Sequence, residues 1–297
     1  MTFLKLNHVK YLYEGTDAGI QNITFDAHGG DLVAVVGRNG AGKSTLINLL
    51  SGVEKPQEGT ISCSDDLTYH DLGISPQKQS IDWYLNVFDN INLGVLLTGK
   101  DHAECKKATD KIAAVLDLQE LYKRNPDSVS GGQQQRIQVA RALVHDPEIL
   151  FLDEPTVGLD YGYSTALFAY LKDKCEHEKK LIFVSSHDLS LLEDYCNKIL
   201  FLEEGRQVFF GDIHEFLKAH QLVPEYVISY SGSLSEDLQQ QLTGQNIIVN
   251  GQTLTVRDVD KDVLNALIGS LLNEVSITGI ESKKIGLKDI IIDRRRV

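Results

Sequence analysis

The sequence is short of the features that mark membrane, secreted and metal-scaffold proteins. Its 297 residues include only six prolines, one tryptophan and four scattered cysteines, none in a C-x-x-C pair. We therefore expect reduced thiols rather than a disulfide framework or a metal site. No apolar run approaches the roughly 18–20 residues of a membrane-spanning helix, and the N-terminal segment does not have the pattern of a signal peptide. These absences predict a cytosolic chain.

Positive charge is also scarce. Lys and Arg number 29 against 42 Asp and Glu, which gives a formal net charge of −13. A general nucleic-acid binder needs a basic surface that displaces counterions, so nucleic acid is not an expected partner. The 42% hydrophobic and 24% charged residues are ordinary for a globular protein. The length fits one large domain of about 200 residues and a smaller one.

The hydrophobic pattern predicts an α/β sheet with an antiparallel edge. Three runs are apolar without alternation, as in strands buried on both faces: residues 31–36, 148–152 and 181–185. Helical spacing occurs over 44–50 and most of 87–121. Antiparallel strands are expected over 3–9 and 20–27, and in a hairpin of 199–202 with 207–210. Buried strands that alternate with helices are typical of a mostly parallel sheet.

The last part of the chain predicts a small separate α+β domain, with residues 1–222 before it and 223–297 within it. Strands are expected over 226–230 and in a hairpin across Asn250-Gly251, and helices over 235–242 and 261–274. Residues 275–279 and 287–292 fit either strand or helix. The order βαββαβ is typical of a split-βαβ domain.

A glycine-rich segment lies between the first buried strand and the helix that follows it. Residues 37–44, Gly-Arg-Asn-Gly-Ala-Gly-Lys-Ser, satisfy G-x-x-x-x-G-K-[ST]. The glycines let backbone N–H groups turn inward, and the helix directs its partial positive end at the same place. Lys43 suits the β- and γ-phosphates of a nucleotide, and the Ser44 hydroxyl suits Mg²⁺. The placement between strand and helix favours a phosphate loop over a plain glycine-rich turn.

Two further segments carry groups for phosphate chemistry. Asp153 and Glu154 follow the second buried strand; Asp153 suits a Mg²⁺ ligand, and Glu154 a general base or water-positioning group. Without the phosphate loop, a capped turn would explain this pair equally well. Ser130-Gly131-Gly132-Gln133 opens a helix, where exposed backbone N–H groups make a second anion site or an ordinary serine cap.

Together these residues resemble the ATP-binding subunit of an ABC transporter, over about residues 3–215. The resemblance implies an ABC-type P-loop NTPase with a mixed sheet and a helical subdomain at about 78–145. It identifies Ser130–Gln134 as the family signature, with Val129 where leucine is usual. ATP and Mg²⁺ are the implied ligands.

The resemblance also assigns roles along the chain. Tyr13 would stack on adenine, with Tyr11 as its competitor, and Tyr13 is favoured by its offset from Val9. Gln77, Glu154 and His187 are the implied catalytic residues, and Ser44, Gln77 and Asp153 the implied metal ligands. The implied nucleotide contacts are Tyr13, Gly37, Asn39, Gly40, Gly42, Lys43, Ser44 and Thr45, together with Ser130, Gly131, Gly132, Gln133 and Asp160 across an interface.

Partners follow from the same resemblance. In the family, ATP on one subunit's phosphate loop is covered by the other subunit's signature, so a head-to-tail dimer of two copies encloses two ATPs. A separate membrane permease is also implied, with the ATPase peripheral on the cytoplasmic face of the cell membrane. Within residues 78–90, Trp83 and Tyr84 are the candidate permease contacts, unless they belong to the core of the helical subdomain.

The direction of transport depends on the end of the chain. Residues 281–292 are similar to the tail of ATPases that serve multidrug and peptide exporters, which predicts export of a drug, peptide or similar compound. Two alternatives stay open. One is an importer ATPase whose C-terminal domain senses a ligand. The other is a soluble ABC ATPase that acts as a mechanical or assembly factor without a permease.

Overall fold

The computed structural model describes residues 2–219, 225–235, 238, 242, 246–257, 261–283 and 286–293. The chain divides into two compact units, Met1–Phe216 and Leu217–Val297. Across the described part of the chain, no helix has both the length and the apolar character that crossing a membrane requires.

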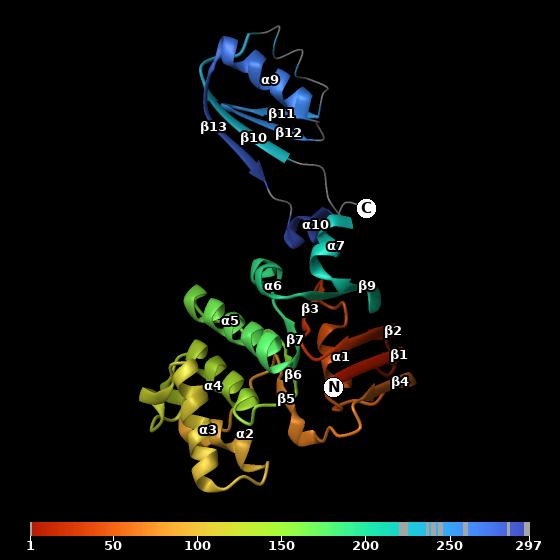
Figure 1. The fold of residues 1–297 in the computed structure, drawn as a ribbon, viewed down its shortest axis with the longest axis vertical. Helices are drawn as coiled ribbons and strands as arrows, with labels where there is room; N and C mark the ends of the chain where they lie inside the picture. Colours follow the sequence, from red (N-terminus) through yellow and green to blue (C-terminus); the bar gives the residue numbers. More distant parts are fainter. Residues whose placement is uncertain are drawn as a thin grey trace. The chain divides into compact units, whose positions relative to one another are not determined.

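A nine-stranded mixed sheet forms the centre of the first unit, in the order β4-β1-β2-β9-β8-β3-β7-β6-β5 (Figure 1). Its parallel part is formed by β3 (Leu32–Gly37), β7 (Leu181–Ser185), β6 (Ile149–Leu152) and β5 (Leu72–Ser75). Every residue of β6 and β7 is buried, as expected for strands that are covered on both faces. The carboxyl ends of these strands therefore meet at one edge of a rigid sheet.

The other strands form the expected antiparallel edge. They are β1 (Phe3–Leu12), β2 (Gly19–His28), β4 (Glu58–Cys63), β8 (Lys198–Glu203) and β9 (Arg206–Asp212). β1 pairs with β2 and β4, and β8 pairs with β9, all in antiparallel fashion. β8 also runs parallel to β3, so the edge is continuous with the parallel part of the sheet.

Helices flank the sheet, and α2 to α6 begin at polar caps. The α-helices of the first unit's chain are α1 (Lys43–Leu50), α2 (Val87–Leu96), α3 (His102–Val115), α4 (Gly131–Leu143), α5 (Tyr161–Glu178), α6 (Leu189–Tyr195) and α7 (Ile213–Ala219), the last of which continues into the second unit. Helices α2, α3 and α4 follow β5 and precede β6 in the sequence, and they pack on one another (Figure 1). This is the part of the chain for which the sequence predicts a helical subdomain. The helical stretch expected over 87–121 is interrupted, because Gly99 has φ +78° and Asp101 caps α3.

The core of the first unit joins both parts of the sheet. The rings of Phe151 and Phe183 stack with centroids 5.6 Å apart, and Phe25 contacts Phe183 at 5.9 Å. Leu46 and Ile47 of α1 belong to the same buried cluster. The helix that follows the glycine-rich loop is thereby anchored to the sheet, and the loop is held between two fixed elements.

The second unit contains a four-stranded antiparallel sheet in the order β11-β12-β10-β13. Its elements are β10 (Glu225–Ser231), β11 (Ile247–Asn250), β12 (Thr253–Arg257), α9 (Lys261–Glu274), β13 (Ser276–Lys283) and α10 (Leu287–Asp293). Ile228, Leu254 and Leu271 are fully buried in its core.

This strand order is that of a split-βαβ domain. The hairpin expected at Asn250-Gly251 joins β11 to β12, and Gly251 adopts φ +59° in the turn. Of the two ambiguous segments, 275–279 lies mostly in β13 and 287–292 in α10. The helix expected over 235–242 falls mostly outside the described residues.

Candidate functional site

The phosphate loop connects β3 to α1 and requires glycine at specific positions. Gly40 and Gly42 have φ +81° and +98°, in the left-handed region that favours glycine. A Cβ atom on Gly42 would lie 2.6 Å from Cγ2 of Ile20, so a side chain would also collide with β2. The loop therefore keeps its backbone open at the N-terminus of α1, which is the arrangement that binds anions.

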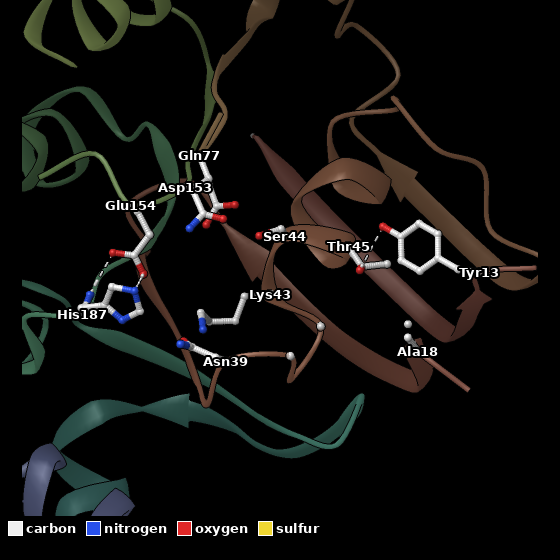
Figure 2. Close-up of a pocket in the computed structure, with 13 residues that line it drawn as sticks. Tyr13, Ala18, Asn39, Lys43, Ser44, Thr45, Gln77, Asp153, Glu154 and His187 are labelled. Atoms are coloured by element: carbon white, nitrogen blue, oxygen red, sulfur yellow. Dashed lines mark hydrogen bonds and ion pairs between the residues drawn. The ribbon is translucent and has the colours of Figure 1, made fainter. Parts of the chain in front are cut away.

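A pocket of about 370 Å³ opens beside this loop (Figure 2). It is lined by Tyr13, Ala18, Gly19, Asn39, Gly40, Gly42, Lys43, Ser44, Thr45, Gln77, Asp153, Glu154 and His187. All but Ala18 and Gly19 were expected as site residues from the sequence. The structure thus gathers residues from five separate segments, whereas Gly37 ends β3 and does not line the pocket.

Tyr13 and Tyr11 have different surroundings. Tyr13 lines the pocket, with its hydroxyl 3.3 Å from Oγ1 of Thr45. Tyr11 meets Tyr13 edge-on at a centroid distance of 5.3 Å and packs against the core cluster of the first unit. This geometry favours Tyr13 as the aromatic available to a ligand, and its contact with adenine stays a prediction.

Lys43 is held by the loop that it follows. Its Nζ donates hydrogen bonds to the carbonyl oxygens of Gly37 (2.9 Å) and Arg38 (3.3 Å). Burial lowers the pKa of Lys43, and the nearby charges of Glu154 and Asp153 act in the opposite direction. A phosphate in the pocket would offer this ammonium group stronger, charged acceptors than the two carbonyl groups.

Asp153 leaves β6 at the floor of the pocket and is 3% exposed. Its Oδ1 accepts a hydrogen bond of 2.6 Å from the hydroxyl of Ser185. Ser44 and Gln77 line the same pocket, so a carboxylate, a hydroxyl and an amide oxygen are available together. This set of hard oxygen donors fits Mg²⁺, which coordinates few protein ligands and otherwise keeps water or phosphate oxygens.

Glu154 has an unusual backbone and a fixed carboxylate. Its φ is +53°, a conformation that costs a residue other than glycine about 1–3 kcal/mol. Oε2 accepts a hydrogen bond from the backbone N–H of His187 (3.0 Å), and Oε1 lies 3.5 Å from Nε2 of the same histidine (Figure 2). Among the described residues, Oε1 has no hydrogen-bond partner. A buried acceptor is therefore free at the edge of the pocket.

Burial is also the main influence on the ionisation of Glu154. It raises the pKa of the carboxyl group, while His187 and Lys43 lower this pKa and Asp153 raises it further. A carboxylate with a raised pKa is a stronger base near neutral pH than an exposed one. The site combines a cation, a metal-type donor set and a candidate base.

The signature residues and Asp160, all of which are described, do not line this pocket. Ser130 caps α4 through its hydroxyl, which accepts from the N–H of Gln133 at 3.3 Å, and Gln133 Oε1 accepts from Ser130 N–H at 2.9 Å. A Cβ atom on Gly132 would lie 2.5 Å from the carbonyl oxygen of Gly158, so glycine lets the two loops approach. Asp160 caps α5 beside them. The signature residues and Asp160 thus lie at the N-termini of α4 and α5, apart from the lining of the pocket.

Trp83 and Tyr84 are on the surface. Their exposed fractions are 53% and 99%, which excludes the alternative that they belong to the core of the helical subdomain. The segment that carries them is held by Asn90, whose side chain accepts from the N–H of Asp82 and donates to its carbonyl oxygen. Two large aromatic rings thus stand exposed on an ordered loop.

Two buried polar residues near the site were not predicted from the sequence. One is Ser185, described above. The other is Gln138 on α4, which is 1% exposed and holds both ends of residues 75–80, the Gln77 loop. Its Nε2 donates to Ser75 Oγ (3.3 Å) and to the carbonyl of Pro76, and its Oε1 accepts from Ser80 N–H (2.8 Å). Only the packing of α4 on this loop reveals the contact.

Replacement of Gln138 by leucine is expected to lower the free energy of unfolding by about 1–3 kcal/mol, because it leaves the partly buried carbonyl of Pro76 and N–H of Ser80 without this partner. Urea denaturation monitored by circular dichroism measures this loss. Gln119→Leu, at an exposed position, is the control and should change stability little. A Gln138→Leu chain as stable as the control would show that these hydrogen bonds contribute nothing.

The fold and the pocket define a P-loop nucleotide-binding protein, and comparisons with known proteins give the family. A sequence model described as "ABC transporter" matches residues 20–157. The sn-glycerol-3-phosphate import ATP-binding protein of Yersinia pseudotuberculosis is 31% identical over 244 residues, which cover 80% of this chain and 68% of that protein. The methionine import ATP-binding protein of Helicobacter hepaticus is 28% identical over 316 residues, covering 99% and 89%. The chain belongs to the ABC transporter ATP-binding proteins.

Solved structures agree with this assignment. The ATP-binding cassette MJ0796, solved as a dimer in a post-hydrolysis state bound to ADP and phosphate, matches with a TM-score of 0.64. The sequences are 25% identical, and the match covers 70% of this chain and 98% of that one. The expected fold is therefore confirmed, and the chain is an ATPase subunit whose hydrolysis of ATP is coupled to transport.

Proposed function

We propose that ATP is hydrolysed in the pocket beside the phosphate loop, with Mg²⁺ held by Ser44, Gln77 and Asp153. The observation that supports this most directly is the meeting of the phosphate loop, two buried carboxylates and His187 in a single cavity. When bound, Mg²⁺ would neutralise charge on the β- and γ-phosphates. Lys43 binds the same phosphates, and Tyr13 stacks on adenine.

Glu154 is the proposed base or water-positioning group. Its free Oε1 is a buried acceptor at the edge of the pocket, and its raised pKa favours proton acceptance. His187 lies next to this carboxylate, with its backbone N–H bonded to Oε2 and its exposed ring 3.5 Å from Oε1, so its ring can donate a hydrogen bond to the γ-phosphate. Gln77 lines the same pocket and is proposed both as a metal ligand and as a catalytic residue.

The active form is proposed to be a head-to-tail dimer of two copies. Ser130 and Gly131 are exposed at the N-terminus of α4, whose first N–H groups can bind an anion. Because these residues do not line the pocket of their own chain, they are available to ATP bound by the partner. A similar cassette has been solved as a dimer with ADP and phosphate.

We propose that this ATPase drives a separate membrane permease. Trp83 and Tyr84 supply exposed aromatic rings of the kind that anchor protein interfaces. We place them at the contact with the permease, which holds the subunit on the cytoplasmic face of the cell membrane. ATP-dependent closure of the dimer would then be passed to the permease through this loop.

We propose import as the direction of transport. The methionine import ATP-binding proteins of Helicobacter hepaticus and Bacillus subtilis align with 99% and 96% of this chain, so these alignments reach into the second unit. Export, which the tail suggested, has no support among these relatives. The second unit is then proposed to sense a ligand, as in the importer alternative considered above.

Uptake assays test this proposal. Deletion of the gene is expected to slow uptake of radiolabelled methionine or sn-glycerol 3-phosphate, the solutes named for the relatives. The wild-type chain should restore uptake, and a Lys43→Ala chain should not. Slower efflux from preloaded cells would instead indicate export. A chain that neither affects transport nor sediments with membranes would favour the soluble assembly factor.

A further inference from the structure

The residue opposite Asp153 on the neighbouring strand is a serine. β6 and β7 run parallel with Leu152 paired to Val184, so the next residues, Asp153 and Ser185, lie level with each other. Ser185 ends β7, is fully buried and does not line the nucleotide pocket. Its hydroxyl is therefore directed at neighbouring protein groups.

The two hydrogen bonds of this hydroxyl have a fixed direction. The N–H of Glu154 can only donate, so Ser185 Oγ accepts from it at 2.9 Å. The single proton of the hydroxyl is then free to point at Asp153 Oδ1, 2.6 Å away. The resulting chain, from Glu154 N–H through Ser185 to Asp153, suits an ionised carboxylate, which is the form that binds a divalent cation.

Ser185 also holds Glu154 at a point where the backbone is unfavourable. Glu154 has φ +53°, which is unfavourable for a residue other than glycine. Its backbone N–H is buried and therefore needs a hydrogen-bond acceptor, which Ser185 Oγ provides. The carboxylate end of Glu154 is held by the backbone N–H of His187, two residues beyond Ser185. One short segment at the end of β7, residues 185–187, thus fixes both ends of the proposed base and one oxygen of the proposed metal ligand.

We propose that Ser185 is a positioning residue for the hydrolysis of ATP. It holds one oxygen of Asp153 so that the carboxylate is presented to Mg²⁺ in one orientation, and it fixes the peptide that carries Glu154. Ser185 itself touches neither nucleotide nor metal. This inference rests on the proposed function, and it adds a residue outside the phosphate-binding motifs to the machinery that determines metal affinity.

The test compares Ser185→Thr with Ser185→Val. The two side chains have nearly the same shape and add the same bulk to a buried position, so they differ chiefly in the hydroxyl group. One readout is the binding of fluorescent ADP in EDTA, which depends on the phosphate loop. The second is the Mg²⁺ concentration that half-saturates nucleotide binding and ATP turnover, with Mn²⁺ bound to the ADP complex followed by electron paramagnetic resonance.

We expect Val to raise the half-saturating Mg²⁺ concentration about 10–100-fold relative to Thr, the range found for residues that orient metal ligands. The Mn²⁺ spectrum should change with Val and be retained with Thr. ADP binding in EDTA should stay within a few-fold of wild type in both chains, because the phosphate loop is not altered. A merely structural role would weaken both readouts together.

Equal Mg²⁺ dependence of the Thr and Val chains would overturn the inference. If neither chain binds ADP in EDTA, the added bulk has disrupted the fold, and Ser185→Ala decides by the same readouts. Ser51→Ala is its control, since Ser51 is also buried and its hydroxyl donates to the carbonyl oxygen of Asn48 near the end of α1. A wild-type chain without Mg²⁺-dependent nucleotide binding would count against the proposed function itself, whereas a Mg²⁺-dependent wild type with unaffected variants would remove only Ser185.

Discussion

Replacement of Lys43 by alanine is expected to abolish ATP turnover while the subunit stays folded. Among the described residues, Nζ of Lys43 hydrogen-bonds to two carbonyl groups of its own loop, and burial already disfavours its charge, so the fold loses little. The reaction loses a positive charge aimed at the β- and γ-phosphates. Removal of one such group typically costs about 10²–10³ in rate, which brings turnover to the background of a phosphate-release assay.

Lys172→Ala is the matched control for this experiment. Lys172 is a partly exposed lysine on α5 that pairs with Glu176 at 4.0 Å. Its removal should leave both turnover and the circular dichroism spectrum unchanged. Turnover near the wild-type rate in the Lys43→Ala chain would refute the role given to the phosphate loop.

The second large effect is expected from Glu154→Gln, which separates binding from hydrolysis. Glutamine keeps the shape of the side chain and can still accept from the backbone N–H of His187, but it has no negative charge. Loss of a positioned base typically reduces the rate about 10²–10⁴-fold. ATP and Mg²⁺ should still bind through Lys43, Ser44 and Asp153, so the γ-phosphate persists and the two subunits remain closed around it.

Size-exclusion chromatography measures this directly. The Glu154→Gln chain should elute as a monomer without nucleotide and as a dimer with ATP, and ADP should not produce the shift. Addition of Ser130→Arg, which blocks the opposing signature, should return the ATP-bound chain to a monomer. Hydrolysis at the full rate would refute the role of Glu154. A chain that binds ATP yet stays monomeric would leave that role standing and contradict the two-ATP dimer.

Local patterns predicted most of the residues that line the pocket. The phosphate loop is continuous in sequence, and Asp153, Glu154 and His187 follow buried strands whose parallel arrangement brings their ends together. Ser185 could not be singled out, because its partners depend on the register between β6 and β7. Gln138 was missed for the same kind of reason, since its burial depends on how α4 packs against the Gln77 loop.

The break between α2 and α3 could also have been predicted from the sequence. Gly99 and the capping residues Asp101 and Glu104 stand in the middle of the stretch expected as helix. The direction of transport is a different matter. The solute site would lie in the permease, so neither the pocket nor the sheet of this chain determines which way a solute moves.

The exposure of Trp83 has a practical consequence for following this protein in solution. Because the sequence has one tryptophan, excitation at the red edge of the absorption band yields emission from a single place in the chain. That indole is 53% exposed and stands six residues after Gln77, at the end of a segment that Gln138 ties to α4. The unmodified protein therefore carries an intrinsic fluorescent probe on the exposed segment that follows Gln77, a residue of the nucleotide pocket.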